Sequence, residues 1–212
     1  MKKISTITSF FCLATLVVSA QKNYEYQDTR RKNESFIRLQ PRPVRMDVAT
    51  FALGGISESV GTTPLQKIPF TFISSDSIAF EGQGIKAWVA LAPFNKEAHR
   101  LDYDEKYLIR IDRRTYYGNY GTVPETYVSD VKMIIYGDTV AIPKLAYSDL
   151  FNLHFSYLDK GVQRSTSAIY RSRDGRYTYL YLFSKDDAGS YEVTWVFDGK
   201  KYMRRVLDYD LL

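Results

Sequence analysis

The chain of 212 residues contains one cysteine and two histidines. The cysteine, Cys12, lies in the apolar N-terminal stretch, so removal of that stretch leaves no disulfide and no thiol chemistry. The sequence has no His-Glu-x-x-His, His-x-His or Gly-x-Ser-x-Gly pattern, which leaves little from which to build a zinc site or a serine nucleophile. We expect no metal and no cofactor, with His99 solvated and His154 packed or at an edge.

The first twenty residues predict a cleaved signal peptide. Lys2 and Lys3 form a short positive region, residues 9–18 are mostly apolar, and Val18-Ser19-Ala20 offers compact residues at a cleavage position. The apolar run is shorter than the about 20 residues that span a bilayer, so an uncleaved anchor is the weaker alternative. We therefore expect a bacterial exported protein, periplasmic or extracellular and associated with the outer membrane, without a transmembrane segment after cleavage.

The formal net charge of +5 is unevenly placed. Residues 21–47 hold seven basic and four acidic side chains, whereas residues 48–212 hold 20 of each. The folded body is thus neutral, which argues against a nucleic-acid partner. Residues 21–47 are predicted to form an extended, solvated N-terminal arm, in which Pro41-Arg42-Pro43 interrupts regular structure. Contact of this arm with an anionic surface is the alternative.

Residues 48–212 predict a single all-β domain. Short runs rich in β-branched and aromatic residues alternate with Gly, Asp and Ser clusters, which is typical of an antiparallel β-sandwich or a partly open barrel. Pro64 and Pro69 favour an edge position for the strand over residues 65–73. Residues 148–151 predict one short helical turn. Further strands are expected at residues 85–91, 107–112, 131–136, 139–142, 155–158 and 166–170.

The strongest local pattern is a three-stranded meander over residues 176–208. Asp198-Gly199 between two alternating runs predicts a type I′ hairpin turn, which places Phe197 opposite Lys200. With this register, Glu192 pairs with Arg205 on a face turned to solvent. The opposite, core face is expected to carry Val193, Trp195, Phe197 and Tyr202.

The long connection over residues 113–127 is the candidate recognition loop. It is rich in Tyr, Gly and Asn, which are typical of binding loops because tyrosine gives a large amphipathic contact at low entropy cost. In that role, Tyr117 and Tyr120 should be exposed. The alternative is a loop that folds its tyrosines back onto the rim of the domain. The candidate ligand-binding residues are Arg114, Tyr116, Tyr117, Asn119, Tyr120 and Tyr127.

Three function classes follow from these patterns. The first is a non-catalytic binding module of the bacterial envelope that contacts a polysaccharide or a protein through the loop. The second is a glycan-acting hydrolase that draws carboxylates from separate loops, which a cleft with two carboxylates and aromatic walls would favour. The third is a structural subunit that forms an oligomer through its N-terminal arm or an edge strand.

Overall fold

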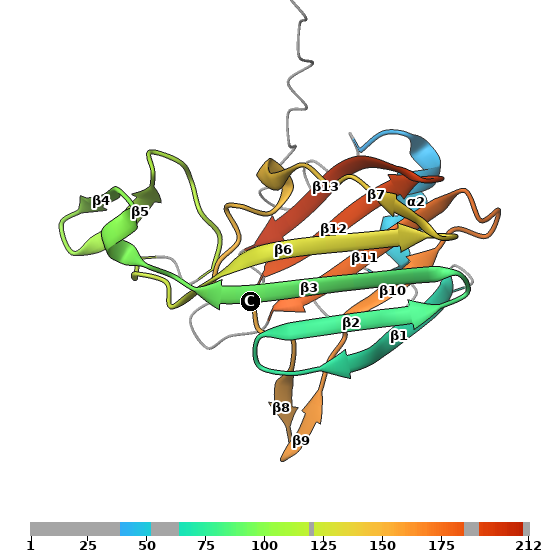
Figure 1. The fold of residues 1–212 in the computed structure, drawn as a ribbon, viewed down its shortest axis with the longest axis horizontal. Coiled ribbons are helices and arrows are strands. Elements are labelled where there is room, and N and C mark those ends of the chain that lie inside the picture. Colours follow the sequence, from blue (N-terminus) through green and yellow to red (C-terminus); the bar gives the residue numbers. More distant parts are fainter. Residues whose placement is uncertain (1–38, 52–63, 119–120, 185–190, 210–212) are drawn as a thin grey trace, which may run out of the picture.

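The computed structural model describes residues 39–51, 64–118, 121–184 and 191–209 (Figure 1). The expected all-β, antiparallel fold is confirmed, while the predicted signal peptide and residues 21–38 lie outside the described part. The strands are β1 (Gln66–Ile73), β2 (Ser77–Gly82), β3 (Ile85–Pro93), β4 (Leu101–Asp104), β5 (Tyr107–Ile111), β6 (Thr126–Ile135), β7 (Asp138–Val140), β8 (Tyr157–Asp159), β9 (Val162–Arg164), β10 (Ala168–Arg171), β11 (Tyr177–Ser184), β12 (Tyr191–Asp198) and β13 (Lys201–Tyr209).

Nine strands form one large sheet in the order β13-β12-β11-β10-β1-β2-β3-β6-β7. The prolines suggested that β1 is an edge strand, but β1 lies within the sheet, at its corner. Its residues 66–69 pair with β10 and its residues 70–73 pair with β2, with an irregularity between Phe70 and Phe72. Pro69, which has no N–H to give, sits where the partner changes, so a central strand tolerates it.

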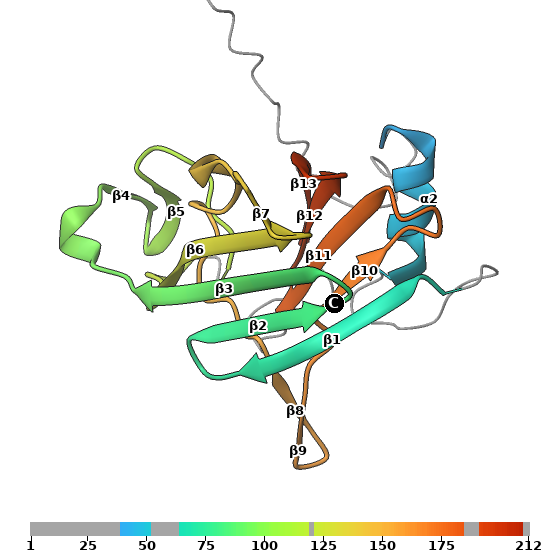
Figure 2. The same ribbon diagram turned by 45° about the vertical axis from the view of Figure 1, so that its right-hand side comes forward.

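The sheet folds over at this corner, so that it is nearly barrel-shaped (Figures 1 and 2). The main core fills the interior between the two halves and includes Ile78, Phe80, Val89, Trp195 and Phe197, all essentially inaccessible. The two edges of the sheet are β7 and β13. An ion pair between Asp138 of β7 and Lys200, which precedes β13, links them at one end.

The helix α2 (Arg42–Phe51) covers the outer face of β10, β11 and β12 (Figure 2). It buries Val44, Val48 and Phe51, spaced so that they share one face, and thereby makes a second core with tyrosines of β11. The boundary expected after residue 47 therefore falls inside a packed helix. Residues 42–47, expected to be solvated linker, are a structural part of the body.

The C-terminal meander is present, but its register differs from the prediction. Gly199 and Lys200 form the turn, and Asp198 pairs with Lys201. Of the two turn residues only Gly199 has a positive φ, 57°, which fits a type II′ rather than a type I′ turn. A further register shift between Val196 and Phe197 adds one residue on β13. As a result, Glu192 lies opposite Asp208, and Arg205 lies opposite Trp195.

The expected solvent face of the meander is also wrong, because α2 and its neighbours cover it. Glu192, Thr194 and Val196 are all buried. The Glu192 carboxylate accepts a hydrogen bond of 2.8 Å from the hydroxyl of Tyr181, which satisfies one of its oxygens inside the second core. The single helical turn expected at residues 148–151 lies slightly earlier, as the 3₁₀ turn η3 (Lys144–Ala146).

Removing the Phe51 side chain tests whether α2 is part of the fold. Phe51 is 5% exposed and stacks on Tyr170 with ring centroids 4.3 Å apart. Phe51→Ala should lower the free energy of unfolding by about 3 kcal/mol, because it leaves a cavity under the helix. Met46→Ala, at an exposed position of the same helix, should change it by no more than about 0.5 kcal/mol. Equal effects in urea unfolding would contradict the packing of α2.

The carboxylate that ties α2 to the sheet gives a pH prediction. Asp47 accepts a hydrogen bond of 2.6 Å from the Tyr179 hydroxyl, and burial raises its pKa above the usual 3.8. A raised pKa in the folded state means that the stability contributed by this group falls as the pH rises above 3.8 and through the folded value. Asp47→Asn should therefore gain stability relative to the unchanged chain over that window. Unfolding curves measured from pH 3.5 to pH 7 should diverge; parallel curves would reject the shift.

Candidate functional site

The β4–β5 hairpin stands off one end of the large sheet, beyond the end of β3 (Figure 1). A third apolar cluster attaches it, in which Leu108 and Ile111 of β5 pack with Tyr116 and Phe151. Phe151 is at the centre of this cluster, because Phe94 and Tyr116 both meet it edge-on at centroid distances of 5.4 and 5.9 Å. The hairpin is thus held by aromatic packing rather than by strand pairing to the large sheet.

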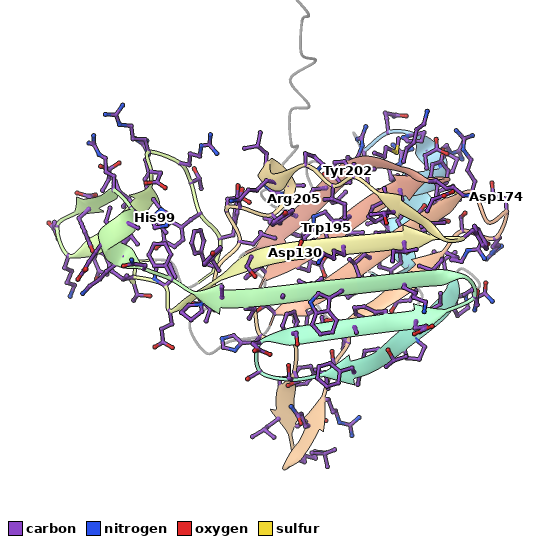
Figure 3. The ribbon with its side chains drawn as sticks, viewed as in Figure 1. His99, Asp130, Asp174, Trp195, Tyr202 and Arg205 are labelled. Atoms are coloured by element: carbon purple, nitrogen blue, oxygen red, sulfur yellow. The ribbon has the colours of Figure 1, made fainter. Side chains whose placement is uncertain are left out.

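A histidine–aspartate pair lies at the base of this hairpin. Pairing of Leu101 with Ile111, extended by a hydrogen bond from the Asp112 amide to the Arg100 carbonyl, places Asp112 beside His99. The Asp112 carboxylate lies 2.7 Å from Nδ1 of His99, and it accepts a hydrogen bond of 2.9 Å from the Arg100 amide. These hydrogen bonds, that of His99 first, lower the pKa of Asp112 below 3.8. His99 is exposed, as expected, and its ring also stacks on Phe94 with centroids 4.7 Å apart. Figure 3 shows His99 in the hairpin, away from the large sheet.

The tyrosine-rich connection folds onto the rim of the domain at two of its tyrosines. Tyr116 and Tyr117 are 5% and 6% exposed, so the expectation that Tyr117 is exposed is wrong. The Tyr116 hydroxyl donates to the carbonyl of Leu108 and accepts from the amide of Gly121. Arg114 is exposed and Tyr127 is half-buried, whereas Asn119 and Tyr120 lie outside the described residues.

A close backbone approach explains why the connection folds inward. The Tyr117 amide donates to the carbonyl of Asp149, and the Phe151 amide donates to the carbonyl of Tyr117. Gly118, at φ 102°, lies so close that a Cβ there would be 2.0 Å from the Phe151 oxygen. Glycine is therefore required at this position, and its presence lets residues 116–118 run beside residues 149–151.

The segment that follows β7 is anchored by Arg205 of β13. The Arg205 guanidinium pairs with both carboxylate oxygens of Asp149, and its side chain is only 2% exposed. It also lies 5.8 Å from the centroid of the Tyr117 ring. Trp195 adds a hydrogen bond of 2.9 Å from Nε1 to the carbonyl of Ala146 in η3. Figure 3 shows Arg205 and Trp195 in the sheet, away from His99 in the hairpin lobe.

The base of the β4–β5 hairpin, the connection after β5 and the segment around η3 line a cavity of about 640 Å³. One part of its lining is aromatic and includes Phe94, Tyr116, Tyr127 and Phe151. The polar part is supplied by the hairpin base and by the segment around η3. The polar lining residues are His99, Asp112, Arg114, Thr115, Lys144, Ser148 and Asp149. An apolar wall with a few converging polar groups is the usual composition of a ligand site.

Three of the predicted site residues, Arg114, Tyr116 and Tyr127, line this one cavity, whereas Tyr117 packs in the main core instead. Ser148 and Asp149, in the predicted helical turn, and Lys144, just before it, were not expected in a site. His99 was expected to be solvated, and it is exposed, but its place in the cavity lining was not foreseen. The pairing of residues 117 and 150 brings these groups together, and no local sequence pattern signals that pairing.

A second exposed feature lies on the outer face of β1 and β3. Phe72 and Trp88 are 49% and 38% exposed, and their rings lie nearly parallel with centroids 6.0 Å apart. The ion pairs Lys86–Glu81 and Lys132–Asp130 flank this pair on neighbouring strands. The surface is not part of the cavity, so it serves as a reference position for experiments on ligand binding.

No family model, no curated protein and no solved structure matches the chain. Within residues 39–51, 64–118, 121–184 and 191–209, no helix is long and apolar enough to cross a membrane. In the same residues, no group of three or more His, Cys, Asp or Glu side chains is arranged to hold a metal ion.

The pairing of Asp149 with Arg205 predicts that this carboxylate is structural. Asp149→Ala would leave the guanidinium buried without its partner, so it should cost about 3–5 kcal/mol of unfolding free energy. Asp159→Ala, which breaks the exposed pair with Arg164, should cost less than about 1 kcal/mol. Urea unfolding of both variants measures the difference. A small effect of Asp149→Ala would show that the carboxylate is free for another role.

Proposed function

We propose that the protein is an exported, non-catalytic binding module of the bacterial envelope whose ligand is a polysaccharide. The cavity beside the β4–β5 hairpin, and not the tyrosine loop alone, is the proposed site. The observation that carries this proposal is the lining, where aromatic rings and hydrogen-bonding side chains face one volume of about 640 Å³. The export of the chain rests on the predicted signal peptide.

The chemistry of a sugar ring fits such a lining. A pyranose has apolar C–H faces, which pack on the negative faces of aromatic rings, and a rim of hydroxyls, which need polar partners. Phe94 and Tyr127 supply aromatic surface, while Thr115 and Ser148 supply hydroxyls. A volume of this order is within the range of small-ligand sites, so one or two sugar rings of a longer chain are the expected occupants.

A glycan-acting hydrolase is the second candidate, because two carboxylates, Asp112 and Asp149, line the aromatic cavity. A glycosidase of this kind needs one carboxylic acid with a raised pKa to protonate the leaving group. Asp112 has the opposite shift, since the hydrogen bond from His99 lowers its pKa. Asp149 is held by the buried guanidinium of Arg205. Both carboxylates are therefore engaged in structure, which favours binding over hydrolysis.

Obstructing the cavity tests the proposal. Thr115 is exposed and lines the cavity, so Thr115→Trp should fill its mouth with little change in melting temperature. Affinity for the polysaccharide that the unchanged chain binds should fall at least about tenfold, which corresponds to about 1.4 kcal/mol. Affinity electrophoresis against dextran, laminarin, alginate, polygalacturonate and hyaluronan provides the measurement, and released reducing ends report hydrolysis.

Two control variants locate the binding surface. Tyr103→Ala removes an exposed aromatic ring of the same hairpin outside the cavity, and it should leave binding unchanged. Trp88→Ala removes the exposed ring on the face of β3, and it should also leave binding unchanged. If Trp88→Ala abolishes binding while Thr115→Trp does not, the sheet face is the site and the cavity is not. Retention of the chain by an envelope protein extract but by no polysaccharide would contradict the proposed ligand class.

A further inference from the structure

The charged side chains that line the cavity differ in whether they are paired with other groups of the protein. Two acidic groups, Asp112 and Asp149, and two permanently basic groups, Arg114 and Lys144, line it, together with His99. The numbers of acidic and basic side chains are equal, but their effects on a ligand are not. A charge that is already paired within the protein attracts a ligand much less than an unpaired one.

Both carboxylates are committed to protein partners. Asp149 accepts from the two terminal nitrogens of Arg205, one of them at 3.0 Å, so a buried cation cancels its charge. Asp112 accepts from His99 at 2.7 Å and from the amide of Arg100 at 2.9 Å. Neither carboxylate can turn toward a ligand without breaking a hydrogen bond that holds the hairpin or the sheet edge in place.

The two cations are not committed in this way. In the described residues, neither Arg114 nor Lys144 forms an ion pair within 4.0 Å, and both are exposed residues of the cavity lining. Arg114 acts on Asp112 only at longer range, where its charge helps to lower the pKa of that carboxyl. They come from different segments, Arg114 from the turn after β5 and Lys144 from the start of η3. Two cations thus line the cavity together with one carboxylate, Asp112, that has no ion pair to Lys or Arg, and this excess of positive charge makes the cavity attractive to an anion.

We propose that the cavity selects a sugar residue that carries a carboxylate, such as a uronic acid, with Arg114 and Lys144 as the carboxylate-binding residues. This inference rests on the proposed function, and it names the ligand class of the same site. Arg114 offers a planar fork of N–H donors that matches the two oxygens of a carboxylate, while Lys144 adds a point charge. The aromatic rings then hold the apolar face of the ring that bears the carboxylate.

Methyl esterification of the ligand isolates the carboxylate. Alginate, polygalacturonate and hyaluronan are each compared with their methyl-esterified forms, which keep the sugar ring and lose the charge. The whole chain should bind at least one acidic form about tenfold more tightly than its ester, as expected for hydrogen bonds to a charged group. Raising NaCl from 0.1 M to 1 M should weaken only the acidic form, because the screening length falls from about 10 Å to about 3 Å.

Charge-removing variants assign the two residues. Arg114→Gln and Lys144→Gln should each reduce affinity for the acidic form by about fivefold to tenfold and leave affinity for the ester unchanged. Arg110→Gln removes an exposed charge from β5 outside the cavity lining, and it should affect neither form. A sulfated galactan bound more tightly than any uronic polymer would assign the site to sulfate esters and reject the carboxylate.

The outcomes separate this inference from the proposed function. If the acidic and esterified polymers bind equally and Thr115→Trp abolishes both, the cavity binds glycans but does not select charge, and only the inference is overturned. If no polymer binds in either form, the proposed function and the inference both fail. If Arg110→Gln weakens binding as much as Arg114→Gln, the effect is one of overall charge and the assignment to the cavity is wrong.

Discussion

The buried guanidinium of Arg205 is the contact on which the arrangement of this protein depends. A sheet that folds over at β1 brings its two edges, β7 and β13, toward each other without pairing them. The chain between β7 and β8 closes the side of the interior that the edges leave open. Arg205 and Trp195 reach this segment from the β12–β13 hairpin and bind Asp149 and the carbonyl of Ala146. Strand side chains thus make the closure by binding one carboxylate and one backbone carbonyl of a loop, where a full barrel would use a ladder of hydrogen bonds.

That closure also places the cavity. Once Asp149 is fixed on Arg205, residues 149–151 lie between the start of β6 and the connection at Tyr117, and both neighbours hydrogen-bond to them. Phe151 is then directed into the cluster that attaches the β4–β5 hairpin. A buried ion pair costs desolvation energy that its own attraction barely offsets, so its contribution here is one of position more than of net stability. A hydrophobic substitute for Arg205 would fill the volume but would not orient the segment.

The sequence predicted the β class and the meander because those signals are local. Alternating apolar runs and Asp-Gly turns are visible within ten residues, and β11, β12 and β13 lie close to where they were expected. The helix α2 was missed because Pro41-Arg42-Pro43 resembles a linker, although proline is compatible with the first turn of a helix. Val44, Val48 and Phe51 carried the helical spacing among basic neighbours. Without the helix, the second face of β12 was assigned to solvent, and the buried Glu192 was placed on the surface.

The candidate site was predictable only in part, since its lining comes from several segments that are far apart in the sequence. Arg114, Tyr116 and Tyr127 were found through the composition of their loop, yet that composition did not distinguish a displayed tyrosine from a packed one. Gly118 is the residue that makes the packed arrangement possible, because it allows residues 116–118 to lie against Phe151.

The same packing bears on the choice between binding and hydrolysis. Asp112 holds a hairpin and Asp149 holds a sheet edge, so the hydrogen bonds of both carboxylates are part of the fold. The charged groups of the lining without an ion pair of their own to Asp or Glu are the cations Arg114 and Lys144, and this is the reason for proposing an acidic ligand.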